Sequence, residues 1–141
     1  MTIAGLVKES WTLLQYGPLV LAVALFALYL FRSDEQVQAR DTSGAALRWA
    51  IVILSTMLVP VLFHLFMARH YEFQYVFENS GQDLETIYRF SAVWAGQAGT
   101  FFLWYWLTAL VLVFLRRPGP FARGAYMMVG LVLVVIGIFL V

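Results

Sequence analysis

The chain has 141 residues, of which 62% are hydrophobic and only 12% are charged, and its formal net charge is +1. A soluble domain of this length could not bury so much apolar surface, so the composition indicates a protein whose solvent is lipid. Cysteine is absent, which excludes disulfides, thiolate metal sites and covalent haem attachment through a CxxCH pair. The small net charge gives no reason to expect a nucleic-acid partner.

Four apolar stretches are long enough to cross the hydrocarbon core of a bilayer, which takes about 20 helical residues. None has the alternating apolar and polar pattern of a barrel strand. The sequence therefore predicts an all-α integral membrane protein, one domain over 1–141 with four transmembrane helices. We expect the first stretch to be a retained anchor, because it ends without a small-x-small cleavage site. The predicted spans are 13–31, 45–67, 90–115 and 122–141.

The distribution of lysine and arginine predicts the orientation of these spans. Arginines are concentrated in and beside the first and third connections, which places those connections in the cytoplasm. Both termini and the connection 68–89 then lie outside, in a multi-pass protein of the bacterial inner (cytoplasmic) membrane. The inner set is Arg32, Arg40, Arg48, Arg116, Arg117 and Arg123, and the outer set is Lys8, Arg69 and Arg89.

The connection 68–89 is too aromatic for a flexible linker, and it also carries Glu72, Glu78, Asp83 and Glu85. A short interfacial helix capped by Ser80 or Asp83 would lead into the third span. One interpretation is a solvated loop whose aromatic side chains rest on lipid headgroups. The other is a docking surface for a partner outside the membrane.

The start of the third span combines small residues with one amide. Helices in lipid associate where small side chains let their backbones approach, and an amide in hydrocarbon needs a hydrogen-bond partner. Two sets of small residues recur here every four positions, which predicts a helix packed against neighbours. Gly130 and Gly137 in the fourth span predict a second packing surface. The predicted packing residues of the third span are Ser91, Ala92, Ala95, Gly96, Gln97, Gly99 and Thr100.

Trp104 and Trp106 lie near the bilayer centre by helical rise, where a buried indole N–H needs an acceptor. Helix packing is one interpretation, and an aromatic wall for a haem, quinone or pigment is the other. His64 in the second span could bind haem iron if another subunit supplied the second ligand, or could hydrogen-bond to a neighbouring helix. His70 lies about 120° further around a helix, so the two histidines cannot form a ligand pair unless the helix breaks.

A composite pattern across the loop and the third span resembles the amino-terminal region of CcmF/NrfE-type cytochrome c haem lyase subunits. The layout is similar as well: two helices, an outward loop, a glycine-rich helix, a basic turn and a fourth helix. The residues that carry the resemblance are Tyr75-Val76, Asn79-Ser80, Leu84, Tyr88-Arg89-Phe90-Ser91-Ala92, Trp94, Gly96, Gly99, Thr100 and Leu103-Trp104.

The resemblance implies a role in c-type cytochrome maturation, as a membrane scaffold fragment or split subunit of a CcmF-like haem lyase. It implies partners such as the remaining carboxy-terminal part of the lyase and CcmE-, CcmH- or CcmI-like proteins, with haem present in the assembled complex. The residues expected to dock a partner are Tyr75, Asn79, Ser80, Tyr88, Arg89 and Trp94.

The chain departs from the family pattern at three places, and two of them, Ala98 and the absent haem-handling segment, favour a second hypothesis. Ala98 stands where the family has glutamate, Glu85 stands where it has proline, and the tryptophan-rich WWD haem-handling segment lies beyond the matched region. No haem ligand carries over, no metal motif or catalytic set is present, and we do not expect this chain to be catalytic by itself. The alternative is a non-catalytic accessory subunit of a respiratory or photosynthetic electron-transfer complex.

Overall fold

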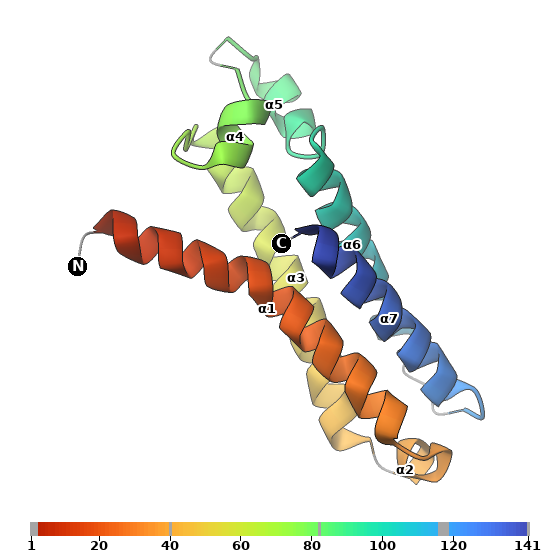
Figure 1. The fold of residues 1–141 in the computed structure, drawn as a ribbon. Coiled ribbons are helices and arrows are strands. Elements are labelled where there is room, and N and C mark those ends of the chain that lie inside the picture. The colour runs from red at the N-terminus through yellow and green to blue at the C-terminus, as the bar shows by residue number, and fades with distance from the viewer. Residues whose placement is uncertain (1–2, 40, 82, 116–118, 141) are drawn as a thin grey trace.

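The computed structural model describes residues 3–39, 41–81, 83–115 and 119–140, with the side chains of 3–15, 38 and 39 left undescribed. These residues form helices joined by turns and contain no strand, which confirms the predicted all-α class (Figure 1). The helices are α1 (Ile3–Phe31), α2 (Asp34–Ala39), α3 (Thr42–Met67), α4 (Gln74–Asn79), α5 (Thr86–Ala92), α6 (Gln97–Phe114) and α7 (Ala122–Leu140).

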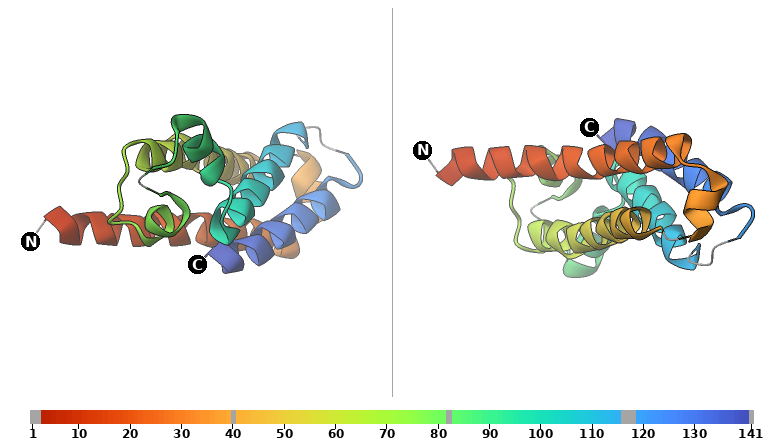
Figure 2. Two further views of the ribbon diagram at one scale, coloured as in Figure 1. Left: turned by 90° about the horizontal axis from the view of Figure 1, so that it is seen from above. Right: turned by 90° about the horizontal axis from the view of Figure 1, so that it is seen from below.

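The four long helices form a bundle in which each makes most of its contacts with two others, in the cyclic order α1, α7, α6, α3. Helix α2 lies at one end of the bundle, hereafter the α2 end, and α4 and α5 lie at the other, hereafter the α4–α5 end (Figure 1). The amino-terminal part of α1 extends beyond the other helices (Figure 2).

Among the described residues, three helices are long and apolar enough to cross a membrane: α3, α6 and α7. They coincide with three of the four predicted spans in length and composition, although the third begins at Gln97 rather than at residue 90. The described apolar part of α1, Tyr16–Phe31, is shorter than the 18 residues of such a span. A fourth span and an outward location of both termini therefore stay predictions.

Two apolar cores hold the helices together. The larger lies between α1, α3, α6 and α7, where Tyr29 and Tyr105 are fully buried. The Tyr105 hydroxyl donates to the Pro18 carbonyl at 2.7 Å, which joins α6 to α1. The smaller core, at the α4–α5 end, consists of Leu65, Phe66, Val76, Ala92 and Val93.

Gly130 and Gly137 of α7 form the predicted packing surface. A Cβ built on Gly130 would lie 3.2 Å from the Phe26 backbone, and one on Gly137 would lie 3.1 Å from a Leu19 methyl. Gly130 and Gly137 are seven residues apart on α7, and Leu19 and Phe26 are seven residues apart on α1. The two helices therefore approach closely over two turns.

Asp41 organises the α2 end. Its carboxylate accepts hydrogen bonds from Tyr29 and Arg32, from Arg48 Nη1 at 2.5 Å, and from the Gly44 N–H at 3.0 Å. The last of these bonds caps α3 and satisfies one of the amides that a helix start leaves without a partner. One carboxylate therefore ties the end of α1 to the start of α3.

Arg48 extends this cluster to α7. Its guanidinium carbon lies 4.2 Å from the centre of the Tyr126 ring, a cation–π contact. Burial alone would raise the pKa of Asp41, but hydrogen bonds from Tyr29 and Arg48 and the charges of Arg48 and Arg32 outweigh burial and hold that pKa below its ordinary value. The carboxylate is therefore charged at neutral pH.

We predict that Asp41→Asn lowers the free energy of unfolding by about 3 kcal/mol, because it leaves two guanidinium groups without their shared anion. Thermal unfolding of the purified chain in detergent measures the loss. Asp34→Asn is the matched control, since Asp34 is 61% exposed and 4.0 Å from Arg123, and it should cost less than about 1 kcal/mol.

The pH dependence of stability distinguishes the contribution of the Asp41 charge from that of the shape of its side chain. A carboxylate with a lowered pKa contributes stability above the pKa of the unfolded chain, about 3.9, and loses it as the pH falls through the folded value. The stability difference between wild type and Asp41→Asn should be constant above about pH 5 and shrink as the pH falls below about 4. A difference that does not change with pH would contradict this account.

Candidate functional site

Helix α4 is seated between the end of α3 and the start of α6. After α3 ends at Met67, Arg69 adopts a positive φ of 57°, and the His70 N–H returns to the Leu65 carbonyl at 3.0 Å. This reversal turns the chain back, so that Val76 of α4 is buried in the smaller core. The short helix that leads into α6 is α5, but Glu85 stands at its N-cap in place of the predicted Ser80 or Asp83, and Ser80 instead follows the end of α4.

The prediction of one continuous helix over 90–115 is wrong. Helix α5 ends at Ala92 and α6 begins at Gln97. Between them Gly96 is extended, with φ −83° and ψ 163°, and two tight turns join Trp94 to Ser91 and Ala95 to Ala92. The helical hydrogen bonds that would cross residues 93–96 are therefore not made.

Side chains replace the lost helical bonds. In a continuous helix the Val93 carbonyl would accept from residue 97, whereas here it accepts from the Tyr75 hydroxyl at 2.9 Å. The Trp94 carbonyl accepts from Thr100 Oγ1 at 3.0 Å, and the same hydroxyl contacts the Gly96 carbonyl at 3.1 Å. The break persists because its carbonyls keep partners, as an apolar environment requires.

Two glycines make room for α4. A Cβ on Gly99 would collide with the Tyr75 hydroxyl and the Val93 carbonyl, and a Cβ on Gly96 would lie 2.6 Å from Asn79 Oδ1. Tyr75 and Asn79 are one helical turn apart on α4, so both point into this gap. The Tyr75 ring also packs edge-on against Phe66, with centroids 5.5 Å apart. Burial raises the pKa of Tyr75, so its hydroxyl stays protonated and donates.

We call this arrangement the helix junction: Tyr75, Val93, Gly96, Gly99 and Thr100. The sequence predicts that its small residues lie on one helix packed against neighbours. The structure instead places Gly96 and Gly99 against α4 of the same chain. The role of Val93 was missed, because a backbone acceptor leaves no mark in the sequence.

The other predicted packing residues are less enclosed. Gln97 is the first residue of α6 and is exposed, as are Ser91 and Ala95, whereas Ala92 is buried. The Ser91 hydroxyl donates to the Tyr88 carbonyl at 2.9 Å. A packing role for the exposed residues stays a prediction.

The predicted docking residues divide into inward and outward sets. Tyr75 and Asn79 are half-buried and face α6, and Ser80 is buried. Trp94 stacks on Phe102 at 6.3 Å and meets Phe63 edge-on at 5.6 Å. Arg89 donates from Nε to the Leu84 carbonyl at 2.9 Å, a part-buried bond. Tyr88 is 60% exposed and is the predicted docking residue best placed to meet a partner.

The three candidate cofactor residues do not converge. Trp106 donates its indole N–H to Thr56 Oγ1 of α3 at 3.1 Å, the acceptor that a central indole was expected to need. His64 lies eight residues beyond Thr56, about 12 Å along α3 by helical rise. Trp104 is 60% exposed on α6. These positions do not form a haem site within the described chain, and a contribution to haem binding in an assembly stays a prediction.

The break after α3 brings the two histidines together. The rings of His64 and His70 are 5.9 Å apart, and His70 Nδ1 lies 2.8 Å from Glu72 Oε1. The hydrogen bond to His70 lowers the pKa of Glu72. Over the part of the chain that the structure describes, no three His, Cys, Asp or Glu side chains are grouped so that they could hold a metal ion.

Comparison with known proteins gives one partial similarity. A 49-residue segment, 35% of this chain, is 43% identical to the cytochrome c-type biogenesis protein CcmF of Haemophilus influenzae. The matched segment covers only 8% of that protein's length. No family model matches the chain, and no solved structure matches it. The similarity supports a CcmF-like relationship and a link to cytochrome c biogenesis.

We predict that Gly99→Ala destabilises the chain by about 2 kcal/mol, because the added methyl group must displace Tyr75 or the Val93 carbonyl. Gly124→Ala in α7 is the matched control, since nothing lies within 4 Å of a Cβ there, and it should leave stability unchanged or raise it. Thermal unfolding in detergent compares the two. Equal melting temperatures for both variants would contradict the close packing at Gly99.

A second prediction concerns the bond between α3 and α6. Thr56→Val leaves the Trp106 N–H without an acceptor and should cost about 1 kcal/mol. In a Trp106→Phe background the same change should cost almost nothing, since no donor remains. An equal cost in both backgrounds, measured by thermal unfolding, would show that the bond does not contribute.

Proposed function

We propose that this chain is the amino-terminal membrane scaffold of a CcmF-like haem lyase in c-type cytochrome maturation. In this role it positions other parts of the lyase and does not carry out the chemistry itself. Its partners are a polypeptide segment that carries the WWD haem-handling region and CcmE-, CcmH- or CcmI-like proteins.

The observation that carries this proposal is the 43% identity to CcmF over 49 residues. The helix junction supports it, because residues that carry the family resemblance pack onto one another: Tyr75, Gly96, Gly99 and Thr100. A pattern kept as a packed unit is more specific than isolated matching dipeptides. It implies a shared local structure and leaves the activity to be tested.

The exposed face beside the junction suits a scaffold. Phe77, Ile87, Tyr88 and Phe90 are each at least 58% exposed, and they lie on α4 and α5 at one end of the bundle (Figure 1). Exposed apolar and aromatic side chains are typical of protein or membrane contacts.

A second candidate function rests on Ala98. It is an exposed residue in the first turn of α6, at the position where the family pattern has glutamate. Loss of that acid is compatible with a scaffold that has left haem handling and serves as an accessory subunit of a respiratory or photosynthetic complex.

The proposal predicts which proteins copurify with the chain. The tagged chain, expressed from its own promoter and purified in a mild detergent, should bring down WWD-bearing and CcmE- or CcmH-like polypeptides, identified by mass spectrometry. An absorption spectrum reports whether haem accompanies them. Stoichiometric recovery with an electron-transfer complex, and without maturation proteins, would favour the accessory-subunit function instead.

A variant test links the junction to maturation in the cell. Gly99→Ala should lower holocytochrome c several-fold by haem staining, whereas Gly124→Ala should not. Immunoblots of this chain and of apocytochrome c separate loss of function from loss of protein. Normal holocytochrome c in a strain that lacks this chain would refute a role in maturation.

A further inference from the structure

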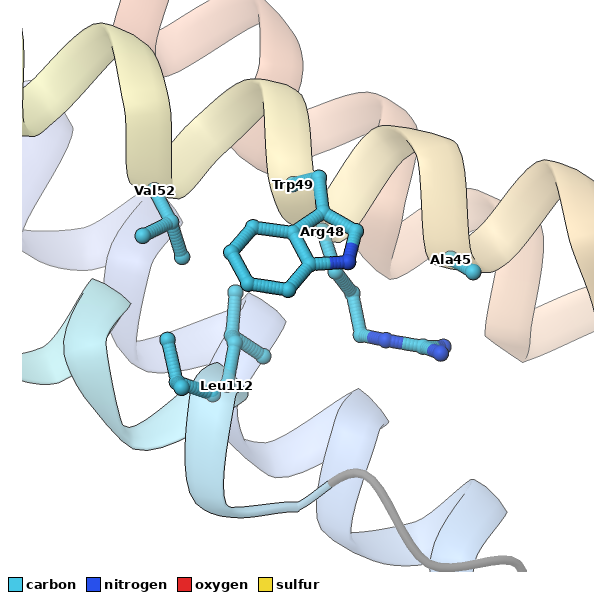
Figure 3. A pocket seen from close by; sticks show the side chains of 6 residues that line it. Ala45, Arg48, Trp49, Val52 and Leu112 are labelled. Carbon is cyan, nitrogen blue, oxygen red and sulfur yellow. The ribbon is translucent and has the colours of Figure 1, made fainter.

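A cavity of about 250 Å³ lies between α3 and α6 at the α2 end, apart from the helix junction. Figure 3 shows side chains of α3 pointing towards Leu112 of α6, with the Arg48 guanidinium to one side of Trp49 and Val52 to the other. The lining is therefore polar at one end and aliphatic at the other. The lining residues are Ala45, Arg48, Trp49, Val52, Leu112 and Val113.

The charge balance beside the cavity is positive. Arg32 and Arg48 share the single carboxylate of Asp41, and all three side chains are less than a quarter exposed. The cluster of these three residues thus carries one excess positive charge. Because this positive charge is largely shielded from water, binding of an anion next to the Arg48 guanidinium is favourable.

We propose that this cavity binds an anionic phospholipid. The phosphate of the headgroup would contact Arg48, and the first part of an acyl chain would lie against Val52, Leu112 and Val113. The volume suits part of a ligand rather than a whole one, since enclosed sites for drug-sized molecules are about 300–1,000 Å³. Basic pockets between membrane helices bind acidic headgroups for the same electrostatic reason. A lipid held here would bridge α3 and α6.

Native mass spectrometry of the purified chain tests this inference with defined lipids. Phosphatidylglycerol and phosphatidylcholine with identical acyl chains are titrated separately, so that only the headgroup charge differs. We expect one phosphatidylglycerol to bind about ten-fold more tightly than phosphatidylcholine. Equal binding of the two lipids would overturn the proposed selection for an anion.

Cavity-filling variants locate the binding site. Val113→Phe and Ala45→Phe fill the cavity from α6 and α3 and leave the Asp41 cluster unchanged, and each should reduce phosphatidylglycerol affinity about ten-fold. Met57→Phe is the control, because Met57 is 63% exposed on α3 and does not line the cavity. Circular dichroism verifies that each variant is folded. Unchanged affinity in a folded filling variant would overturn the site.

Arg48→Gln and a competition experiment identify the source of the anion. In Arg48→Gln the guanidinium is lost, so the preference for phosphatidylglycerol over phosphatidylcholine should disappear. Both lipids should then bind this variant weakly. Inorganic phosphate at millimolar concentration should not displace the lipid, because the acyl chain contributes to binding. Complete displacement would show that the site takes a free anion and would overturn the lipid assignment.

Discussion

The hydrogen bond from the Tyr75 hydroxyl to the Val93 carbonyl is the constraint on which the α4–α5 end depends. Residues 93–96 interrupt an apolar helix, and an unpaired carbonyl there would cost several kcal/mol in lipid. Tyr75 removes that cost from the neighbouring helix α4, provided that Gly96 and Gly99 leave space for it. Helix α4, the break and the start of α6 are therefore one structural unit.

The opposite end of the bundle is held by charge as well as by packing. Asp41 joins α1 to α3, and Arg48 continues the contact to the Tyr126 ring on α7. Between the two ends, glycines of α7 lie against α1, and Trp106 joins α6 to α3. These contacts hold the four long helices together from one end of the bundle to the other.

The helical class, three apolar spans and the glycine face of α7 follow from residue runs and spacing, because lipid leaves an apolar helix few alternatives. The break before Gln97 does not. It depends on a hydroxyl eighteen residues before Val93 in the chain, and the pattern of small residues is equally compatible with a continuous helix. His64 and His70 show the same limit, since only the turn at Arg69 brings their rings to 5.9 Å. Local pattern predicts elements, whereas long-range partners decide where they end.

A double-mutant cycle of Tyr75→Phe and Gly99→Ala tests the central claim most directly. The methyl group that Gly99→Ala introduces would collide with the Tyr75 hydroxyl, so removing that hydroxyl should recover part of the stability that Gly99→Ala loses. The account predicts a coupling free energy of about 1 kcal/mol from thermal unfolding of the four proteins. Additive effects, within about 0.5 kcal/mol, would show that Tyr75 and Gly99 do not meet and would contradict the junction.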